Sequence, residues 1–248
     1  MRREQHELGL DGHDHGLSVI VYGHSGRPVI VFPSEAGRAW DFENNQMVDA
    51  VGDLVESGRA RLYCVDSLDA YSWSATEAPI DERARRHGLY TAWLADRLVP
   101  FIRAGNDAGS DLMALGCSLG AYHAVHFALQ RADLLPLAIG LSGNYDVSTW
   151  RAWGERGDAT YFANPRDYVA NLHGDHLRWL QERLSLLLIC GQGQWETSPT
   201  GSLPSTQAMA AALQAKQIRC ELDLWGHDVS HDWPWWARQL AHHLPRFC

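Results

Sequence analysis

Residues 112–124 read Leu-Met-Ala-Leu-Gly-Cys-Ser-Leu-Gly-Ala-Tyr-His-Ala, and this stretch is the most informative part of the sequence. An apolar run leads into a Gly-x-Ser-x-Gly turn, in which Gly116 and Gly120 flank Ser118 at two residues on each side. This spacing is typical of a nucleophile elbow, where a tight turn between a strand and a helix strains the serine backbone and exposes its hydroxyl. Glycine fits the two flanking positions because a side chain there would collide with the neighbouring strand or helix.

The residues around the turn support this interpretation. Residues 111–115 form a short buried-strand run, and residues 120–131 have helical spacing of their apolar side chains. The turn places the amide of Leu119 at a helix N-terminus, where it can stabilise negative charge on an attacked carbonyl oxygen. The alternative is an ordinary strand-to-helix turn, because a pattern with three fixed positions also recurs by chance. We predict that Ser118 is a nucleophile and that the Leu119 amide forms half of an oxyanion hole.

Length and charge limit the classes of function. The chain has 248 residues, of which 46% are hydrophobic, and no repeat or low-complexity linker divides it, so we expect one domain over residues 1–248. The net charge of −9 and the absence of a lysine- or arginine-rich run argue against nucleic acid or an anionic membrane surface as a partner. A small neutral substrate is easier to accommodate. Neither charge nor composition argues against a homo-oligomer.

The N-terminus and the cysteines indicate the compartment. No apolar stretch of about 7 residues follows the first positive charges, and no segment approaches the roughly 18 apolar residues of a membrane span. We therefore expect a soluble, cytoplasmic protein. The five cysteines are an odd number. We interpret Cys64, Cys117, Cys190 and Cys220, which lie in or beside apolar runs, as reduced core thiols, and Cys248 is the fifth.

Residues 1–16 are polar and contain His13-Asp14-His15, which could bind a metal but has no partner cluster nearby. We expect a solvated, partly disordered arm there instead. Residues 17–22 and 28–32 are β-branched-rich runs joined by a glycine-bearing turn, and we expect them to form a hairpin-like pair.

Strands and helices then alternate along the chain. Further strands are expected at 62–65, 111–115, 137–141, 185–190 and 218–225, and helices at 42–57, 81–103, 120–131, 204–217 and 233–244. A tryptophan-rich, irregular segment at about 147–183 is interpreted as a small insertion over the carboxyl edge of the sheet. Regular alternation of this kind predicts an α/β fold, an α/β/α sandwich with a mostly parallel central sheet and right-handed crossovers.

The loop at residues 33–38 follows a central strand, at the edge where open α/β sheets place their ligand contacts. It is our candidate for the second oxyanion amide, with Glu35 or Ser34 as the donor. The alternative is a plain connection between a strand and a helix.

A serine nucleophile needs a base within hydrogen-bonding distance and a carboxylate that orients the base. In the chain order serine, acid, histidine, the acid follows a later strand and the histidine follows the last one. Glu196 lies in the glycine-containing loop directly after the strand at 185–190. Its rivals are Asp223, which we expect inside the final strand, and Asp228, which lies too near the histidine loop to act independently.

Two histidines compete for the role of the base. His231 lies at the end of the last loop, just before a helix, whereas His227 follows the final strand by one glycine and is interpreted as a loop anchor or pocket residue. The run from His227 to His231 also mimics the zinc-binding H-E-x-x-H motif, with Asp228 in place of glutamate. That motif works only on a helix, and Gly226 and Pro234 argue against one here. We favour His231 as the base and predict no metal.

At these residues the chain resembles the putative esterase family that includes esterase D (S-formylglutathione hydrolase) and the mycolyltransferases, within the α/β-hydrolase superfamily. The matching pieces are the elbow from Gly116, the Cys-Gly-x-Gly-x-x-Glu loop that ends at Glu196, and His231-x-Trp233-x-x-Trp236. The resemblance implies an α/β-hydrolase fold, with Ser118 as nucleophile, Glu196 as acid and His231 as base. The oxyanion loop lacks the cysteine that esterase D-like enzymes often carry, and the N-terminus lacks the signal peptide of the mycolyltransferases.

These residues predict a serine esterase that hydrolyses a small carboxylic ester through an acyl-enzyme on Ser118, without a cofactor. The other class that we considered is a catalytically silent binding protein with the same fold. Eleven tryptophans are many for this length, and we expect four of them to line the substrate site: Trp40, Trp150, Trp195 and Trp233. Aromatic walls suit an acyl, aryl or sugar group equally, so they do not identify the ester.

Overall fold

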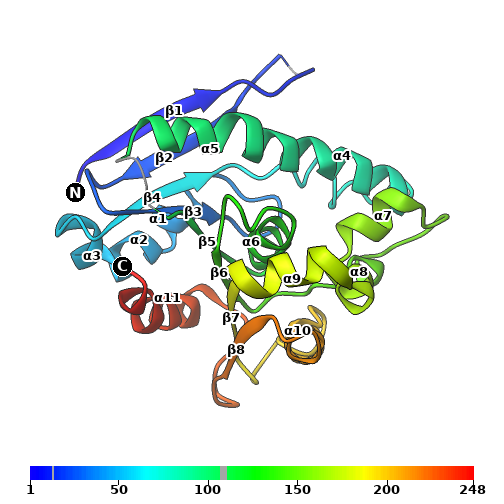
Figure 1. Ribbon diagram of the computed structural model, residues 1–248. Helices are drawn as coiled ribbons and strands as arrows, with labels where there is room; N and C mark the ends of the chain where they lie inside the picture. The colour runs from blue at the N-terminus through cyan, green and yellow to red at the C-terminus, as the bar shows by residue number, and fades with distance from the viewer. Residues whose placement is uncertain (13, 107–110) are drawn as a thin grey trace.

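The computed structural model describes residues 1–12, 14–106 and 111–248. Within these ranges the chain forms one eight-stranded sheet with the order β1-β2-β4-β3-β5-β6-β7-β8 (Figure 1). The pairs from β4 through β3 to β8 are parallel, and β2 is antiparallel to both of its neighbours. The strands are β1 Arg3–Leu8, β2 Leu17–Tyr22, β3 Arg27–Phe32, β4 Ala60–Val65, β5 Met113–Cys117, β6 Leu137–Leu141, β7 Ser185–Cys190 and β8 Arg219–Leu224.

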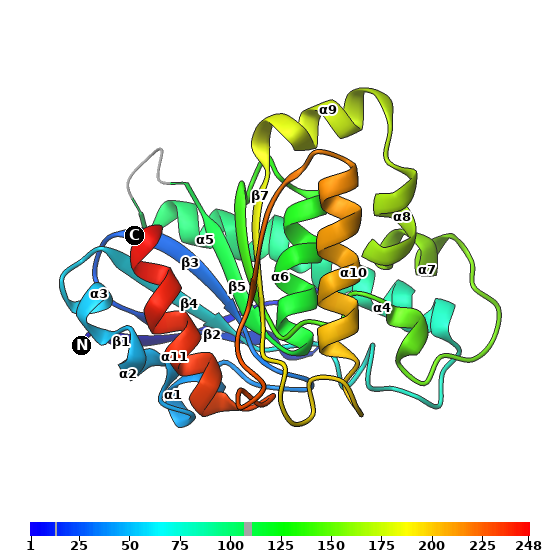
Figure 2. The ribbon, with the colours of Figure 1, turned by 90° about the horizontal axis from the view of Figure 1, so that it is seen from below.

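Helices cover both faces of this sheet. One face carries α1 Asp41–Asn44, α2 Met47–Ala50, α3 Gly52–Glu56 and α11 Trp233–His243 (Figure 2). The other face carries α4 Ile80–Trp93, the π-helical segment η1 Leu94–Leu98, α5 Val99–Ala104, α6 Leu119–Gln130 and α10 Ser202–Ala215. Two short 3₁₀ segments are η2 Val147–Thr149, which begins the segment described below, and η3 Leu244–Arg246, which follows α11.

The core lies in two layers, one on each side of the sheet. Alternate residues of one strand point to opposite layers, so that Ile30 and Phe32 pack against the α4–α6 side while Val29 and Val31 pack against the α11 side. The predicted α/β/α sandwich with a mostly parallel sheet is confirmed. No helix of the described residues is long and apolar enough to cross a membrane.

The hairpin predicted for the first two apolar runs is wrong, because β4 lies between β2 and β3 and pairs with both. The turn between the two strands instead passes around the start of β4. Gly26 has φ of 101°, and a Cβ built on it would lie 2.3 Å from the carbonyl carbon of Arg59. Gly26 therefore lets the turn after β2 pass close to the backbone of Arg59, and it does not close a hairpin between β2 and β3.

The N-terminal arm also differs from the prediction. Residues Arg3–Leu8 form β1, an antiparallel edge strand that pairs with β2 along its full length. Its side chains alternate between exposed and half-buried positions, which is why the polar sequence gave no hydrophobic signal. His13 of the His-Asp-His run lies outside the described residues.

Two predicted helices are interrupted. The helix expected at 42–57 is divided into α1, α2 and α3, and Gln46 adopts a left-handed conformation with φ of 62° between the first two. The helix expected at 81–103 continues through η1, just before Pro100, which has no N–H for the helical hydrogen-bond ladder. Within α4, Leu89 is 41% exposed, whereas His87 and Tyr90 are buried.

The tryptophan-rich segment 147–183 is mostly helical. After η2 it forms α7 Asp158–Ala163, α8 Pro165–Asn171 and α9 Gly174–Arg183. Only its beginning lies at the carboxyl end of β6, because α7 packs on α4, α8 packs on α10, and α9 lies at the opposite end of the sheet, where it leads into β7 (Figure 2). Most of the segment thus extends the helical layer and does not cover the carboxyl edge.

Candidate active site

The elbow has the strain that its glycines predict. Ser118, between β5 and α6, has φ of 57° and ψ of −119°, a region that side chains normally avoid. A Cβ built on Gly116 would lie 2.2 Å from the carbonyl oxygen of Gly120, and one built on Gly120 would lie 2.2 Å from that of Pro33. Both glycines are therefore required sterically. The second contact also shows that the loop after β3 packs directly on the elbow.

Three predicted site residues meet above this turn. The Ser118 Oγ lies 2.9 Å from Nε2 of His231, and Nδ1 of His231 lies 3.0 Å from Oε2 of Glu196. Both distances are within hydrogen-bonding range. The two partners occupy different nitrogens of one imidazole, so the ring can accept the serine proton on one side while the carboxylate holds the N–H on the other. The His231 side chain is 9% exposed and the Glu196 side chain is fully buried.

The loops that carry the acid and the histidine are joined through their backbones. The Gly193 amide donates to the Val229 carbonyl at 2.9 Å, and the His231 amide donates to the Gln194 carbonyl at 3.0 Å. A Cβ on Gly191 would lie 2.2 Å from the Val229 carbonyl oxygen. The glycines after β7 therefore let two loops approach closely, which fixes the distance between the acid and the base.

The carboxylate of Glu196 has further donors that the sequence analysis missed. The Ser142 hydroxyl donates to Oε1 at 2.6 Å, and the Gly191 amide lies 3.3 Å from the same oxygen. The Cys190 thiol donates to Oε2 at 3.3 Å. Burial and the nearby carboxylate raise the pKa of Cys190, so this thiol keeps the proton that it donates. A buried carboxylate needs such donors to compensate for its lost hydration.

Trp236, in α11, contacts both Ser142 and His231. Its indole N–H donates to Ser142 Oγ at 3.0 Å, and its ring lies edge-on to the His231 ring with centroids 4.8 Å apart. Because Ser142 Oγ accepts this bond, its own hydrogen is directed toward Glu196. Ser142 has φ of 54° and directly follows β6. Its place at the carboxyl end of a buried strand was the one signal in the sequence that pointed to it.

The loop after β3 is held by a buried carboxylate that also contacts an imidazole. The Asp69 carboxylate accepts the Ala36 amide at 3.1 Å on one oxygen and contacts Nε2 of His123 at 2.9 Å on the other. Both side chains are at most 1% exposed. In the part of the chain that the structure describes, no hydrogen bond uses the amides of Leu119, Glu35 or Ser34. The oxyanion role expected for the Leu119 amide and for Glu35 or Ser34 stays a prediction.

The rival residues lie elsewhere. Asp223 is in β8, where it accepts hydrogen bonds from Trp225 Nε1 and His243 Nε2, both at 2.8 Å. Asp228 and His227 are exposed. Among the described residues no group of three or more His, Cys, Asp or Glu side chains is placed to hold a metal ion. The paired zinc ligands considered above also conflict with the geometry, because both ring nitrogens of His231 already have partners.

The four tryptophans predicted to bind substrate occupy different environments. Trp195 and Trp40 are 48% and 37% exposed, and Trp195 directly precedes the acid Glu196. Trp233 is partly buried and packs edge-on against Trp236, with ring centroids 5.1 Å apart. Trp150 packs against Tyr122 at 4.9 Å between ring centroids, within the core on the α4–α6 side.

Comparison with known proteins identifies the family of the chain. The family described as Putative esterase matches residues 19–247. None of the curated proteins matches the sequence. Among solved structures, a ferulic acid esterase superposes with a TM-score of 0.74 and 14% identity, covering 99% of this chain and 96% of the other.

Two further structures are similar over nearly their whole length. An S-formylglutathione hydrolase from Agrobacterium tumefaciens has a TM-score of 0.70 and 15% identity, covering 98% of this chain and 93% of the other. MPT51 (FbpC1) of Mycobacterium tuberculosis has a TM-score of 0.69 and 12% identity, covering 99% and 97%. The structural likeness supports the fold, and the family match supports the class of reaction. The chain belongs to the putative esterase family and is a carboxylic ester hydrolase with the α/β-hydrolase fold.

Proposed function

We propose that the protein is a serine esterase that hydrolyses a small carboxylic ester through a Ser118-His231-Glu196 triad. The observation that carries the proposal is the continuous set of hydrogen bonds from Ser118 Oγ through both nitrogens of His231 to Glu196, at 2.9 and 3.0 Å. Each residue comes from a different loop at the carboxyl edge of the sheet, as a site built on an α/β fold requires. Membership of the esterase family supports the same class of reaction.

In the proposed mechanism, Ser118 Oγ attacks the ester carbonyl carbon while Nε2 of His231 takes the hydroxyl proton. The carbonyl becomes a tetrahedral oxyanion, which the Leu119 amide and an amide of Glu35 or Ser34 stabilise. His231 then returns the proton to the leaving alkoxide, and the C–O bond breaks to leave an acyl-serine. Water, activated by the same imidazole, attacks the acyl carbon and releases the carboxylic acid. Glu196 remains ionised and stabilises the imidazolium at each step.

The surroundings of the site favour a small substrate with an apolar part. Trp40, Trp195 and Trp233 offer aromatic surface on the loops around the elbow, and we propose that they contact the substrate. Trp150 faces Tyr122 and Trp73, so a role for its ring in substrate binding remains a prediction. The proposed reaction needs no cofactor. The net charge of −9 also favours a neutral ester over an anionic one.

A cytoplasmic location is part of the same proposal. All five cysteines are unpaired thiols, and Cys64, Cys117 and Cys190 are buried in the core. Reduced thiols in this number are typical of proteins kept in a reducing compartment.

The test is the substitution Ser118→Ala. Hydrolysis of p-nitrophenyl acetate should fall by about 10⁴-fold or more in a protein whose circular dichroism is unchanged. A fluorophosphonate probe should label the wild-type protein at Ser118 and leave the variant unlabelled. Retention of a tenth of the esterase activity by Ser118→Ala would remove the serine from the mechanism. A wild-type protein that binds esters but is neither labelled nor active would favour a catalytically silent binding protein.

A further inference from the structure

The two amides proposed to form the oxyanion hole come from different parts of the chain. The Leu119 amide belongs to the first turn of α6, whereas the amide of Ser34 or Glu35 belongs to the loop after β3. Two donors stabilise one oxyanion only when both lie within hydrogen-bonding distance of it at the same time. The position of this loop relative to α6 therefore matters to the proposed chemistry.

Asp69 contacts both of these segments. Its Oδ2 accepts the Ala36 amide at 3.1 Å, and Ala36 is one residue after Glu35. Its Oδ1 lies 2.9 Å from Nε2 of His123, which is four residues after Leu119 and therefore about one turn farther along α6. A single carboxylate thus links the two segments that carry the proposed donors.

The turn that carries Asp69 is well defined. The Asp69 side chain is fully buried, and its backbone carbonyl accepts the amides of Ser72 and Ser74 at 3.0 and 2.8 Å. A buried carboxylate needs polar partners to compensate for its lost hydration. Asp69 therefore cannot exchange its contacts with Ala36 and His123 for contacts with water.

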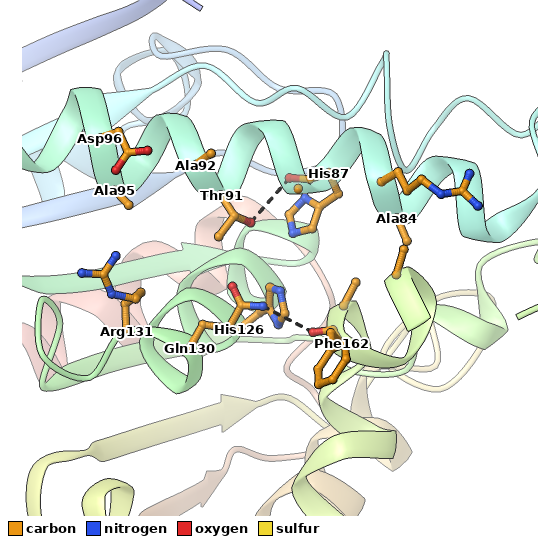
Figure 3. Close-up of a pocket in the computed structure, with 14 residues that line it drawn as sticks. Ala84, His87, Thr91, Ala92, Ala95, Asp96, His126, Gln130, Arg131 and Phe162 are labelled. Carbon is orange, nitrogen blue, oxygen red and sulfur yellow. Dashed lines mark hydrogen bonds between the residues drawn. The ribbon is translucent and has the colours of Figure 1, made fainter. Parts of the chain in front are cut away.

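Packed rings hold His123 at the other end of the link. Its side chain is 1% exposed, and its ring centroid lies 5.2 Å from that of His87 on α4 and 5.8 Å from that of Phe32 at the end of β3. Figure 3 shows the rings of His87 and His126 between α4 and α6, and His126 lies about one turn after His123. A movement of α6 relative to Asp69 would disturb this close packing.

We propose that Asp69 is a positioning residue for ester hydrolysis, which fixes the distance between the two oxyanion donors by holding the loop after β3 against α6. This inference rests on the proposed function, because the oxyanion role of the two amides belongs to it. Asp69 acts through the Ala36 amide and His123, and in the described part of the chain it makes no hydrogen bond to the triad.

The experiment compares Asp69→Ala with Asp69→Asn in steady-state hydrolysis of p-nitrophenyl acetate by the full-length protein. Asp69→Ala removes both contacts, so kcat should fall at least about tenfold, toward the roughly 10²-fold that loss of one oxyanion donor costs. KM should stay within about twofold, because the oxyanion exists only in the transition state and the tetrahedral intermediate. Asparagine keeps an oxygen for the Ala36 amide and can donate an N–H to a neutral His123 ring, so Asp69→Asn should retain kcat within about threefold.

Asp81→Ala is the matched control. The Asp81 carboxylate also accepts backbone amides of a distant segment, those of Gly157 and Thr160 at 3.0 and 2.9 Å, but it joins α4 to the start of α7. Its loss should lower thermal stability and leave kcat within about twofold. Circular dichroism and thermal unfolding verify that each variant is folded. If Asp69→Ala does not fold, His123→Leu replaces it, because this change removes the contact with α6 and should lower kcat by about tenfold.

The outcomes separate this inference from the proposed function. Ser118→Ala is assayed in parallel, and hydrolysis that does not depend on Ser118 would refute the proposed function and this inference with it. Ser118-dependent hydrolysis with kcat of Asp69→Ala within about threefold of the wild-type value would overturn only the role of Asp69. A raised KM in place of a lowered kcat, no recovery in Asp69→Asn, or an equal loss of kcat in Asp81→Ala would overturn it as well.

Discussion

Removal of the Ser142 hydroxyl tests how the acid is held. In Ser142→Ala, Glu196 loses its shortest hydrogen bond, at 2.6 Å, and keeps the Gly191 amide and Cys190 thiol at 3.3 Å as well as His231 at 3.0 Å. A hydrogen bond to a charged group contributes about 1.5–3 kcal/mol. In the transition state the carboxylate faces an imidazolium. If the Ser142 hydrogen bond stabilises that state by about 1.5 kcal/mol more than the ground state, its loss lowers kcat by about tenfold.

The assay is steady-state hydrolysis of p-nitrophenyl acetate, with kcat and KM measured separately. KM should hardly change, because Ser142 is buried and contacts Glu196 and Trp236 but not the open side of the elbow. The free energy of unfolding should also fall by about 1–3 kcal/mol, since the indole N–H of Trp236 loses its acceptor.

Thr206→Val is the matched control. Thr206 is fully buried, and its hydroxyl donates to the Gly143 carbonyl at 3.0 Å and lies beside the Cys190 thiol. The change therefore removes a buried neutral hydrogen bond near the same strand end from a residue that makes no direct hydrogen bond to Glu196. It should lower stability and leave kcat within about twofold. A Ser142→Ala protein with wild-type kcat, or an equal loss of kcat in Thr206→Val, would refute the assignment of Ser142 as a positioning residue.

Three further predictions concern single side chains. Glu196→Gln should lower kcat by about 10²- to 10⁴-fold because an amide cannot stabilise the imidazolium, and a larger loss in Asp228→Asn would show that the acid is misassigned. His231→Ala should abolish fluorophosphonate labelling at every pH whereas His227→Ala should retain it, and mass spectrometry that shows the reverse would transfer the base to His227. Burial and a neighbouring histidine lower the pKa of His126 to about 3. Below pH about 6.5 the unfolded state therefore binds a proton that the folded state does not bind. The free energy of unfolding falls as the pH drops from about 6.5 toward 3. His126→Gln should reduce that slope by about 1.4 kcal/mol per pH unit in urea unfolding between pH 6 and 4, and an unchanged slope would contradict a neutral, buried ring.

The sequence predicted those parts of the structure that local sterics or hydrophobic patterns determine. The elbow could be recognised because the close approach of Gly116 to the Gly120 carbonyl is made within one short turn of the chain. The buried parallel strands were also predictable, because both of their faces are covered and they read as continuous apolar runs. Glu196 and His231 followed from their positions after two of these strands.

Other features depend on contacts between distant segments, which leave little trace in a single sequence. The apolar runs of β2 and β3 gave no sign that β4 pairs between them, because that pairing joins residues about 30 to 45 positions apart. The strand β1 was missed because an edge strand with one partner needs few apolar residues. Ser142 is one hydroxyl without a motif, and only the folded chain shows that it meets Glu196.

The buried Asp69–His123 pair beneath the Ala36 amide has a consequence for how this scaffold can change. The loop after β3 is held at the Ala36 amide by the carboxylate of Asp69, which follows β4 and contacts the imidazole of His123 on α6. We propose that Glu35 or Ser34 donates a backbone amide to the site, and exchange of either side chain leaves the hydrogen bond between the Ala36 amide and Asp69 in place. Engineers could therefore randomise this rim to obtain new selectivities without rebuilding the chemistry beneath it.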